Sequence, residues 1–324
     1  MKNVFKKNIQ LALSLLVTMV APLSAVDCNQ STDCAPICCD RQPCLVSFNA
    51  ELLYWRPELC GLEGAFGNTT IFTTENGNIT TTRIKESHKR PSNKWSPGFR
   101  VGADVAVNCV DVELDWTHYD GRSNFRDCLQ HGRWKIKYDV IDLTFGRQFC
   151  VASCFYLKPF IGLRAAKIHQ RLKSHLVTTF TPAIAGNSTV ITDKNDKEDF
   201  WGIGPQIGLD AGWNLGCNFS LYGKFAVASY YGHVNAKNYD VDTLTRSISI
   251  CDGSKRGCFN TIATDMAIGI RWDACPTCFC GCDVKFNLNL GLEQHRIYDF
   301  SDLGSDGNLS LDGAVFGAGI TFNY

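Results

Sequence analysis

Three acidic residues occupy alternate positions in one short stretch of the chain, at Asp111, Glu113 and Asp115. In an extended strand, residues two apart project from the same face at a spacing of about 7 Å. Carboxylates placed in this way suit a catalytic site, a calcium site or a charged wall that faces water. The positions between them hold the apolar residues Val112 and Leu114, so the stretch has one polar and one apolar face. We therefore interpret the three carboxylates as part of a charged wall.

The seven histidines are scattered, and their spacing matches no metal-binding motif. Only the group formed by His118, Asp120 and His131 could imitate the acid–histidine site found at the outer rim of some barrel enzymes. Asp120 is only two residues from His118, but His131 is separate from both, and no motif joins the three. The sequence therefore predicts a protein that is not an enzyme and that holds neither a metal nor a cofactor.

The start of the chain has the organisation of a secretory signal peptide. Lys2, Lys6 and Lys7 form a basic beginning, residues 9–20 are apolar, and small residues precede a cleavage point after Ala25. The apolar stretch is too short for a membrane-spanning helix, and no apolar run of about twenty residues follows it.

Beyond the signal, apolar and polar residues alternate in about ten segments, which is the pattern of half-exposed β-strands. The segments are residues 46–56, 98–107, 110–117, 134–147, 155–166, 200–215, 219–230, 262–272, 284–292 and 311–324. In the segment 134–147 the apolar positions change phase after Val140, which predicts a β-bulge. The last segment alternates up to the aromatic residue Tyr324.

The segment 200–215 indicates what its apolar face contacts. Trp201 and Trp213 lie at the two ends of that face, separated by roughly 40 Å of strand, or about 28 Å of membrane thickness at a tilt of about 45°. This is close to the apolar band of roughly 25 Å between the aromatic girdles of outer-membrane barrels. The opposite face is small and polar, as a narrow lumen requires.

Short and long connections alternate along the chain, which is typical of barrels with short periplasmic turns and long outer loops. The polar stretches 69–85, with a turn at Asn76 and Gly77, and 240–250 are expected to form loop hairpins or extra strands. We predict an all-β fold, a transmembrane antiparallel up-and-down β-barrel of about 10–12 strands with both ends on the periplasmic side. Residues 1–25 are then the signal peptide, 26–45 a cysteine-rich periplasmic segment and 46–324 the barrel. A secreted β-sandwich shows the same alternation and is the alternative.

In such a barrel, charged residues on the polar strand faces are expected to line a pore. They are Glu51, Arg100, Asp104, Asp111, Glu113, Asp115, Lys135, Lys137, Arg164, Asp210, Lys224, Asp265, Arg271, Lys285 and Glu293. Aromatic residues near the ends of the apolar faces are expected to form the lipid girdles. They are Trp116, Trp134, Trp201, Trp213, Trp272, Phe322 and Tyr324.

The 17 cysteines all lie beyond residue 25, which indicates an oxidising compartment. Most fall on the predicted periplasmic side and are candidates for disulfides: Cys28, Cys34, Cys38, Cys39, Cys44, Cys109, Cys150, Cys154, Cys217, Cys275, Cys278, Cys280 and Cys282. Bonds within the chain and cross-links to itself or to other cysteine-rich envelope proteins are alternatives, and the odd count favours at least one external partner. The stretch 275–282 also has the cysteine spacing of a zinc or iron–sulfur site, but an oxidising compartment favours disulfides.

Several motifs resemble those of the pore-forming major outer membrane protein family of Legionella and chlamydia-like bacteria. They are FNAELLYWRP at 48–57 with Gly61 and Leu62 after it, WSPGFRVG at 95–102, KPFIGLRA at 158–165, FWGIGPQIGLD at 200–210, NLGLEQ at 289–294 and the aromatic end. The resemblance implies a porin of the bacterial outer membrane that is also an abundant surface protein. The cysteine content resembles that of the chlamydial members, for which a disulfide-linked envelope is the expected partner.

We therefore expect passive diffusion of small hydrophilic solutes and ions through a narrow lumen. The expected partners are outer-membrane lipid, these solutes and cysteine-rich envelope proteins. A structural or adhesive envelope barrel with little pore activity, and a secreted β-sandwich binding domain, are the alternatives. The formal net charge is +0 at pH 7, which gives no support for nucleic-acid binding.

Overall fold

The computed structural model describes residues 45–60, 70–75, 78–83, 92–107, 110–126, 130–180, 188–216, 218–242, 248–251, 258–274, 283–301, 303 and 307–323. In these ranges the regular structure is β-strand. None of the described segments is a helix long and apolar enough to cross a bilayer. The signal peptide, the segment 26–44 and most of the cysteines lie outside these ranges.

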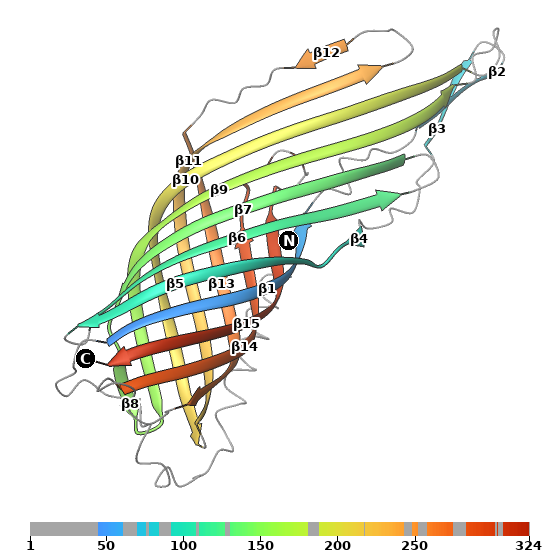
Figure 1. Ribbon diagram of the computed structural model, residues 1–324. Coiled ribbons are helices and arrows are strands. Elements are labelled where there is room, and N and C mark those ends of the chain that lie inside the picture. Colours follow the sequence, from blue (N-terminus) through green and yellow to red (C-terminus); the bar gives the residue numbers. More distant parts are fainter. Residues whose placement is uncertain are drawn as a thin grey trace.

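Ten long strands form a closed antiparallel barrel (Figure 1). They are β1 (Leu45–Leu59), β5 (Ser96–Val107), β6 (Val110–Arg126), β7 (Gln130–Gly146), β9 (Phe155–Phe180), β10 (Ser188–Gly216), β11 (Phe219–Asp242), β13 (Cys258–Ala274), β14 (Asp283–Ile297) and β15 (Leu309–Asn323). Each pairs with its neighbours in chain order, and β15 closes the ring by pairing with β1. Because the sheet closes on itself, the β-sandwich alternative is excluded, and the predicted ten segments correspond to these ten strands.

Shorter strands decorate the barrel. They are β2 (Thr70–Glu75), β3 (Asn78–Arg83), β4 (Ser92–Asn93), β8 (Phe149–Ala152) and β12 (Ile248–Cys251). The pairing of β2 with β3 forms the hairpin expected at 69–85, and β12 pairs with the end of β11 as expected for 240–250.

Short turns identify the periplasmic end of the barrel. Between β10 and β11 the chain reverses at Gly216 and Asn218, whose φ angles of 90° and 67° lie in the left-handed region that glycine and asparagine tolerate best. The Asn214 side-chain oxygen accepts a hydrogen bond from the Gly216 N–H at 3.0 Å and fixes this turn. Leu45 pairs with Asn323, so the first barrel strand begins and the last barrel strand ends at this periplasmic end.

A continuous apolar band covers the outside of the barrel above these turns. Its side chains remain exposed in the isolated chain, with exposed fractions of 64% for Ile161 and Leu292 and 62% for Ile207. A soluble protein rarely exposes apolar surface on this scale, whereas a barrel in hydrocarbon requires it. The band therefore marks the membrane-spanning part of each strand.

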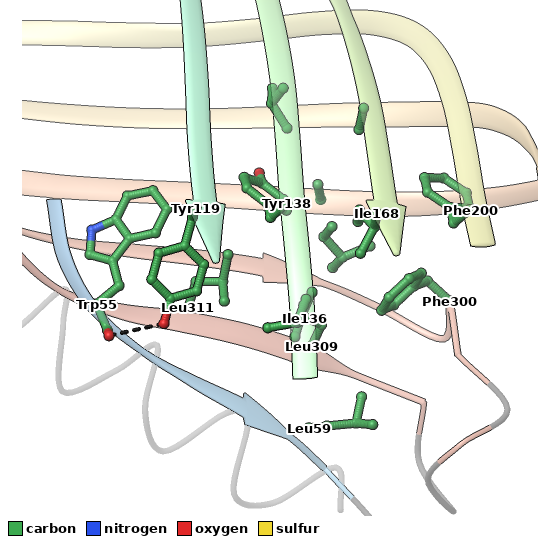
Figure 2. Close-up of a cluster of buried hydrophobic side chains, with 14 of the residues drawn as sticks. Trp55, Leu59, Tyr119, Ile136, Tyr138, Ile168, Phe200, Phe300, Leu309 and Leu311 are labelled. Atoms are coloured by element: carbon green, nitrogen blue, oxygen red, sulfur yellow. Dashed lines mark hydrogen bonds between the residues drawn. The ribbon is translucent and has the colours of Figure 1, made fainter. Parts of the chain in front are cut away.

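Toward the opposite end the strands reverse their polarity, and the apolar side chains point inward. β9, β10 and β11 extend far beyond the band (Figure 1). Where their side chains are described there, the outward ones are mostly polar or charged. The interior at this level holds a cluster that includes Trp55, Tyr119, Tyr138 and Phe200 (Figure 2). A strand that leaves the membrane faces water outside, so its apolar side chains have to be buried inside the barrel.

This reversal corrects two expectations for β7. Trp134, expected at the lipid boundary, is fully buried in the interior, where its indole N–H donates to Gln170 at 2.9 Å. The expected β-bulge is also wrong, because β7 keeps an unbroken register with β6 and β9. The change of phase after Val140 instead marks the point at which the strand crosses the membrane boundary.

Candidate functional site: the barrel interior

Arg100 lies at the centre of an ion-pair network that crosses the lumen. Its guanidinium, on β5, contacts Glu51 of β1 at 2.6 Å and donates two hydrogen bonds to Glu293 of β14, each 2.9 Å long. β5 and β14 are separated by β1 and β15 in the sheet, so the second contact crosses the interior. Arg100 also donates to the Thr117 hydroxyl at 3.0 Å, and Asn289 donates to Glu51 at 2.9 Å. The guanidinium is thus held on three sides.

A second arginine makes a similar bridge. Arg164 of β9 pairs with Asp142 of the adjacent β7 and with Asp265 of β13, which is separated from β9 by β10 and β11. His295 contacts Asp265 at 2.8 Å through Nδ1 and Glu293 at 3.2 Å through Nε2. The histidine joins the two arginine clusters, so the network runs without a break from Asp142 to Glu51.

Nearer the periplasmic end, Lys158 of β9 faces three carboxylates. Its Nζ lies 3.6 Å from Asp111, 3.9 Å from Glu113 and 3.8 Å from Asp210. Asp111 and Glu113 project from the same face of β6, as their spacing predicts. Lys224 of β11 lies close by, with its Nζ 5.3 Å from the Phe160 ring centroid. The charges at this level are therefore predominantly acidic.

Between the ion pairs and the apolar cluster lies a small cavity, with about 30 Å³ of space open to water-sized molecules. Its walls include both arginines and Lys224 below, and Tyr138 and Val140 above. This volume is enough for about one or two water molecules. Among the described residues, no three His, Cys, Asp or Glu side chains meet as a metal site.

Above the cavity, aromatic and aliphatic side chains from six strands meet in the middle of the barrel (Figure 2). We call this layer the apolar seal; it comprises Trp55, Tyr119, Tyr138, Phe200, Tyr230 and Leu311. The Tyr119 hydroxyl donates to the Trp55 carbonyl oxygen at 3.0 Å, which secures one side of the layer. The Trp55 ring also lies 4.6 Å from the His295 ring, so the seal rests directly on the charged network.

The connection between β14 and β15 folds into the mouth of the barrel and covers the seal. Phe300 and Leu303 are 2% and 7% exposed, and Phe300 packs edge-on against Phe200 at 5.6 Å. The Ser301 hydroxyl donates to Glu198 at 2.9 Å and accepts hydrogen bonds from the Gln170 amide and the Leu303 N–H, each at 3.2 Å. We call these three residues, Phe300, Ser301 and Leu303, the cap.

Most of the charged residues expected to line a pore face the interior. They are Glu51, Arg100, Asp104, Asp111, Glu113, Asp115, Arg164, Asp210, Lys224, Asp265, Arg271, Lys285 and Glu293. Lys135 and Lys137 were expected with them, but both point outward from β7 and are exposed. They belong to the part of the strand beyond the membrane, where the polar face is the outer one.

Three interior residues escaped the sequence reasoning. Asp142, Lys158 and His295 complete the ion pairs, although none was expected to line the lumen. Asp142 could have been found from its strand. It alternates with Val140 and Thr144 on one face of β7, which would have marked it as inward if the inward face of that strand had been known. No motif indicates the partners that Lys158 and His295 find across strands.

Of the expected girdle residues, Trp116, Trp201 and Trp272 are exposed on the outer surface, with fractions of 43%, 58% and 37%. Trp213 and Phe322 are partly exposed, and Tyr324 lies outside the described residues. His118 also lies on this surface, with its ring tilted against that of Phe99 at 5.3 Å and its Nδ1 2.6 Å from Asp139. His118 and Asp120 therefore project from the outer wall, which separates them from the interior.

Only two of the cysteines expected on the periplasmic side fall within the described residues. Cys150 and Cys154 lie at the turn from β8 into β9, and both are disulfide-bonded. The other eleven lie outside the described ranges or on residues whose side chains are not described.

The family model described as the Legionella pneumophila major outer membrane protein precursor matches residues 41–317. The chain belongs to this family. The match covers nearly the whole barrel, and it places this family member in the bacterial outer membrane. No curated protein matches the chain.

The chain is similar to several solved structures. One is the outer membrane protease OmpT from Escherichia coli, with 10% sequence identity and a TM-score of 0.36; the match covers 91% of this chain and 100% of that one. Ail, the attachment invasion locus protein of Yersinia pestis, has 11% identity and a TM-score of 0.26, with 87% and 100% covered. The Pseudomonas putida toluene transporter TodX has 9% identity and a TM-score of 0.32, with 88% and 91% covered.

Proposed function

We propose that this family member is a narrow outer-membrane porin whose passage is closed in the described conformation and conducts when the cap withdraws and the apolar seal beneath it opens. The observation that carries the proposal is the charged interior, which continues from the periplasmic end up to the seal. Keeping many ionised groups inside a protein is costly unless they are paired or wetted. A lumen that fills with water and ions is a reason for a barrel to keep them.

The interior charges also bear on which ions would pass through the lumen. Near the periplasmic end the acidic side chains Asp104, Asp111, Glu113, Asp115 and Asp210 outnumber the basic side chains that act on them, which are Lys158, Lys224, Arg100 and Arg271. Rings of carboxylates favour cations. We therefore propose a small conductance with a preference for cations over anions.

Planar bilayers test this proposal, using protein whose insertion is confirmed by heat-modifiable migration on gels. We expect brief, small openings, and a reversal potential in a KCl gradient that reports cation preference. Asp111→Asn should lower this preference, because it removes an interior carboxylate. The matched control is Asp120→Asn, which removes an outward carboxylate from the same strand and should leave the reversal potential unchanged.

A second candidate is a structural envelope barrel with little pore activity. It is favoured by the ion pairs that cross the lumen and by the apolar seal, which enclose a cavity of about 30 Å³ between them. Its cross-links would involve the cysteines at the periplasmic end, near the disulfide-bonded Cys150 and Cys154. Inserted protein that never conducts, together with thiol-sensitive oligomers on non-reducing gels, would support this role instead of the porin.

A further inference from the structure

A row of five basic residues crosses the outer wall of the barrel beyond the apolar band. Arg122 of β6 pairs in register with Lys135 of β7, and Lys135 pairs with Arg171 of β9. Arg171 pairs in turn with Lys197 of β10, and Lys197 with Lys237 of β11. At about 4.8 Å between strands, the row extends over roughly 19 Å. We call it the basic row.

The basic row has little compensation within the chain. Like charges placed directly opposite each other on neighbouring strands destabilise a sheet. None of the five residues forms an ion pair with any other described side chain, and Arg171 makes a single side-chain hydrogen bond, from Nε to Asn195 at 3.0 Å. The row just below is mixed instead, and there Asp199 pairs with His169. The structure therefore leaves a single-sign stripe whose counter-charges have to come from outside.

The height of the basic row points to the source of those counter-charges. On each of its strands, the row lies two or three outward positions beyond the last apolar residue, for example beyond Trp116 on β6 and Trp201 on β10. This corresponds to about 10–14 Å above the hydrocarbon at a tilt of about 45°. The side chains point sideways from the wall, along the membrane surface, and long basic side chains can reach down toward headgroups.

We propose that the basic row binds the phosphate groups of a phosphorylated glycolipid of the lipid A type in the outer leaflet. Arginine and lysine are the usual phosphate ligands, and a row of them can engage more than one phosphate. Among the described residues, the other side of the barrel offers no such stripe. At its membrane boundary Arg56 pairs in register with Asp312, and Asp312 with Gln294, so the charges there are balanced. The glycolipid would then bind on the side formed by β6 to β11. This proposal is independent of pore activity.

The test uses purified full-length protein in detergent and two probes, diphosphoryl lipid A and the same lipid with both phosphates removed. Wild-type protein should bind the phosphorylated form at least about tenfold more tightly, with an affinity that falls as salt rises. The variant Lys135→Gln/Arg171→Gln/Lys197→Gln should lose this difference. The charge-preserving variant Lys135→Arg/Lys197→Arg should keep it.

A matched control removes three basic residues away from the row, in the variant Arg56→Gln/Arg147→Gln/Arg296→Gln. It should bind like wild type, because it loses the same number of positive charges as the row variant but keeps the basic row. Heat-modifiable migration establishes that each variant folds. The proposal is overturned if the row variant binds phosphorylated lipid A as tightly as wild type does, or if the control loses its preference for the phosphorylated lipid equally. It is also overturned if wild-type protein binds the two lipids with equal affinity. Tighter binding of a soluble heparin fragment than of lipid A at the row would assign the surface to a sulfated glycan instead and overturn it too.

Discussion

Replacing Ser301 by alanine tests whether the cap controls the passage. In the closed conformation the Ser301 hydroxyl makes three hydrogen bonds, to Glu198, Gln170 and the Leu303 N–H. The bond to the Glu198 carboxylate is the strongest of them, because hydrogen bonds to charged groups contribute about 1.5–3 kcal/mol. When the cap withdraws, the bonds to Glu198 and Gln170 are lost in the wild type as well, whereas the bond to the Leu303 N–H lies within the cap. Loss of the first two bonds by substitution therefore selectively weakens the closed state.

We therefore expect Ser301→Ala to destabilise the docked cap by about 2 kcal/mol, which corresponds to a roughly 30-fold larger undocked population. In planar bilayers the fraction of time that single channels spend open should rise by a similar factor, while the conductance of each opening stays unchanged. The barrel itself should remain intact, because Ser301 belongs to a connection and not to a strand.

Ser310→Ala is the matched control. Ser310 follows the same connection and donates to Asp312 at 2.8 Å, but it makes no contact with Glu198 or Gln170. It should leave the open fraction unchanged. If Ser301→Ala folds normally and its open fraction equals that of wild type, the cap does not close the passage and the gating argument is wrong.

Three further predictions concern the interior. Arg164→Met should lower the free energy of unfolding by about 3–5 kcal/mol, because Asp142 and Asp265 lose a shared partner inside the barrel. Urea unfolding in detergent measures this change, and Lys167→Met on the outer face of the same strand should have little effect. Gly204→Val should reduce the yield of folded barrel, because even a Cβ at this position overlaps the Ser229 carbonyl oxygen of the neighbouring strand; a normal yield in refolding gels would contradict the packing. Tyr119→Phe should cost about 1 kcal/mol by removing the hydrogen bond to the Trp55 carbonyl, and an unchanged unfolding midpoint would show that this bond adds nothing to the seal.

The fold was largely predictable from the sequence because one face of each strand meets a uniform solvent. In hydrocarbon that face is apolar at every second position, so the starts of β6 and β11 at Val110 and Phe219 follow from period two alone. The predicted ends at 117 and 230 fell short of Arg126 and Asp242, because both strands continue beyond the membrane. The hairpin of β2 and β3 was equally readable from its Asn76 and Gly77 turn. The closure of the barrel by β1 and β15 agrees with the predicted up-and-down barrel, in which the first and last strands pair.

The errors arose where that solvent changes. β7 passes from lipid to water near Val140, and beyond this point its apolar face turns inward without any irregularity of the backbone. Period two reports the alternation but not which side is wet, so Trp134 was assigned to the lipid and Lys135 and Lys137 to the lumen. The apolar seal could not be predicted for the same reason. Its residues point inward because they lie beyond the membrane boundary, and the sequence does not show where along each strand that boundary falls.

The partners of the interior charges were also beyond reach. Arg100 meets Glu293, and Arg164 meets Asp265, through the centre of a ring whose register no single sequence reveals. The sequence did place most of these residues on inward faces. It could not show that they pair with one another and so narrow the lumen.

The most direct test of the account is the orientation of two tryptophans. Single-tryptophan variants that retain either Trp201 or Trp134, with the other six tryptophans replaced by phenylalanine, can be reconstituted with brominated phospholipids that quench fluorescence on contact. The account predicts strong quenching of Trp201, which is 58% exposed on the outer surface, and little quenching of Trp134, which is buried in the barrel interior. Strong quenching of Trp134 together with a protected Trp201 would contradict it.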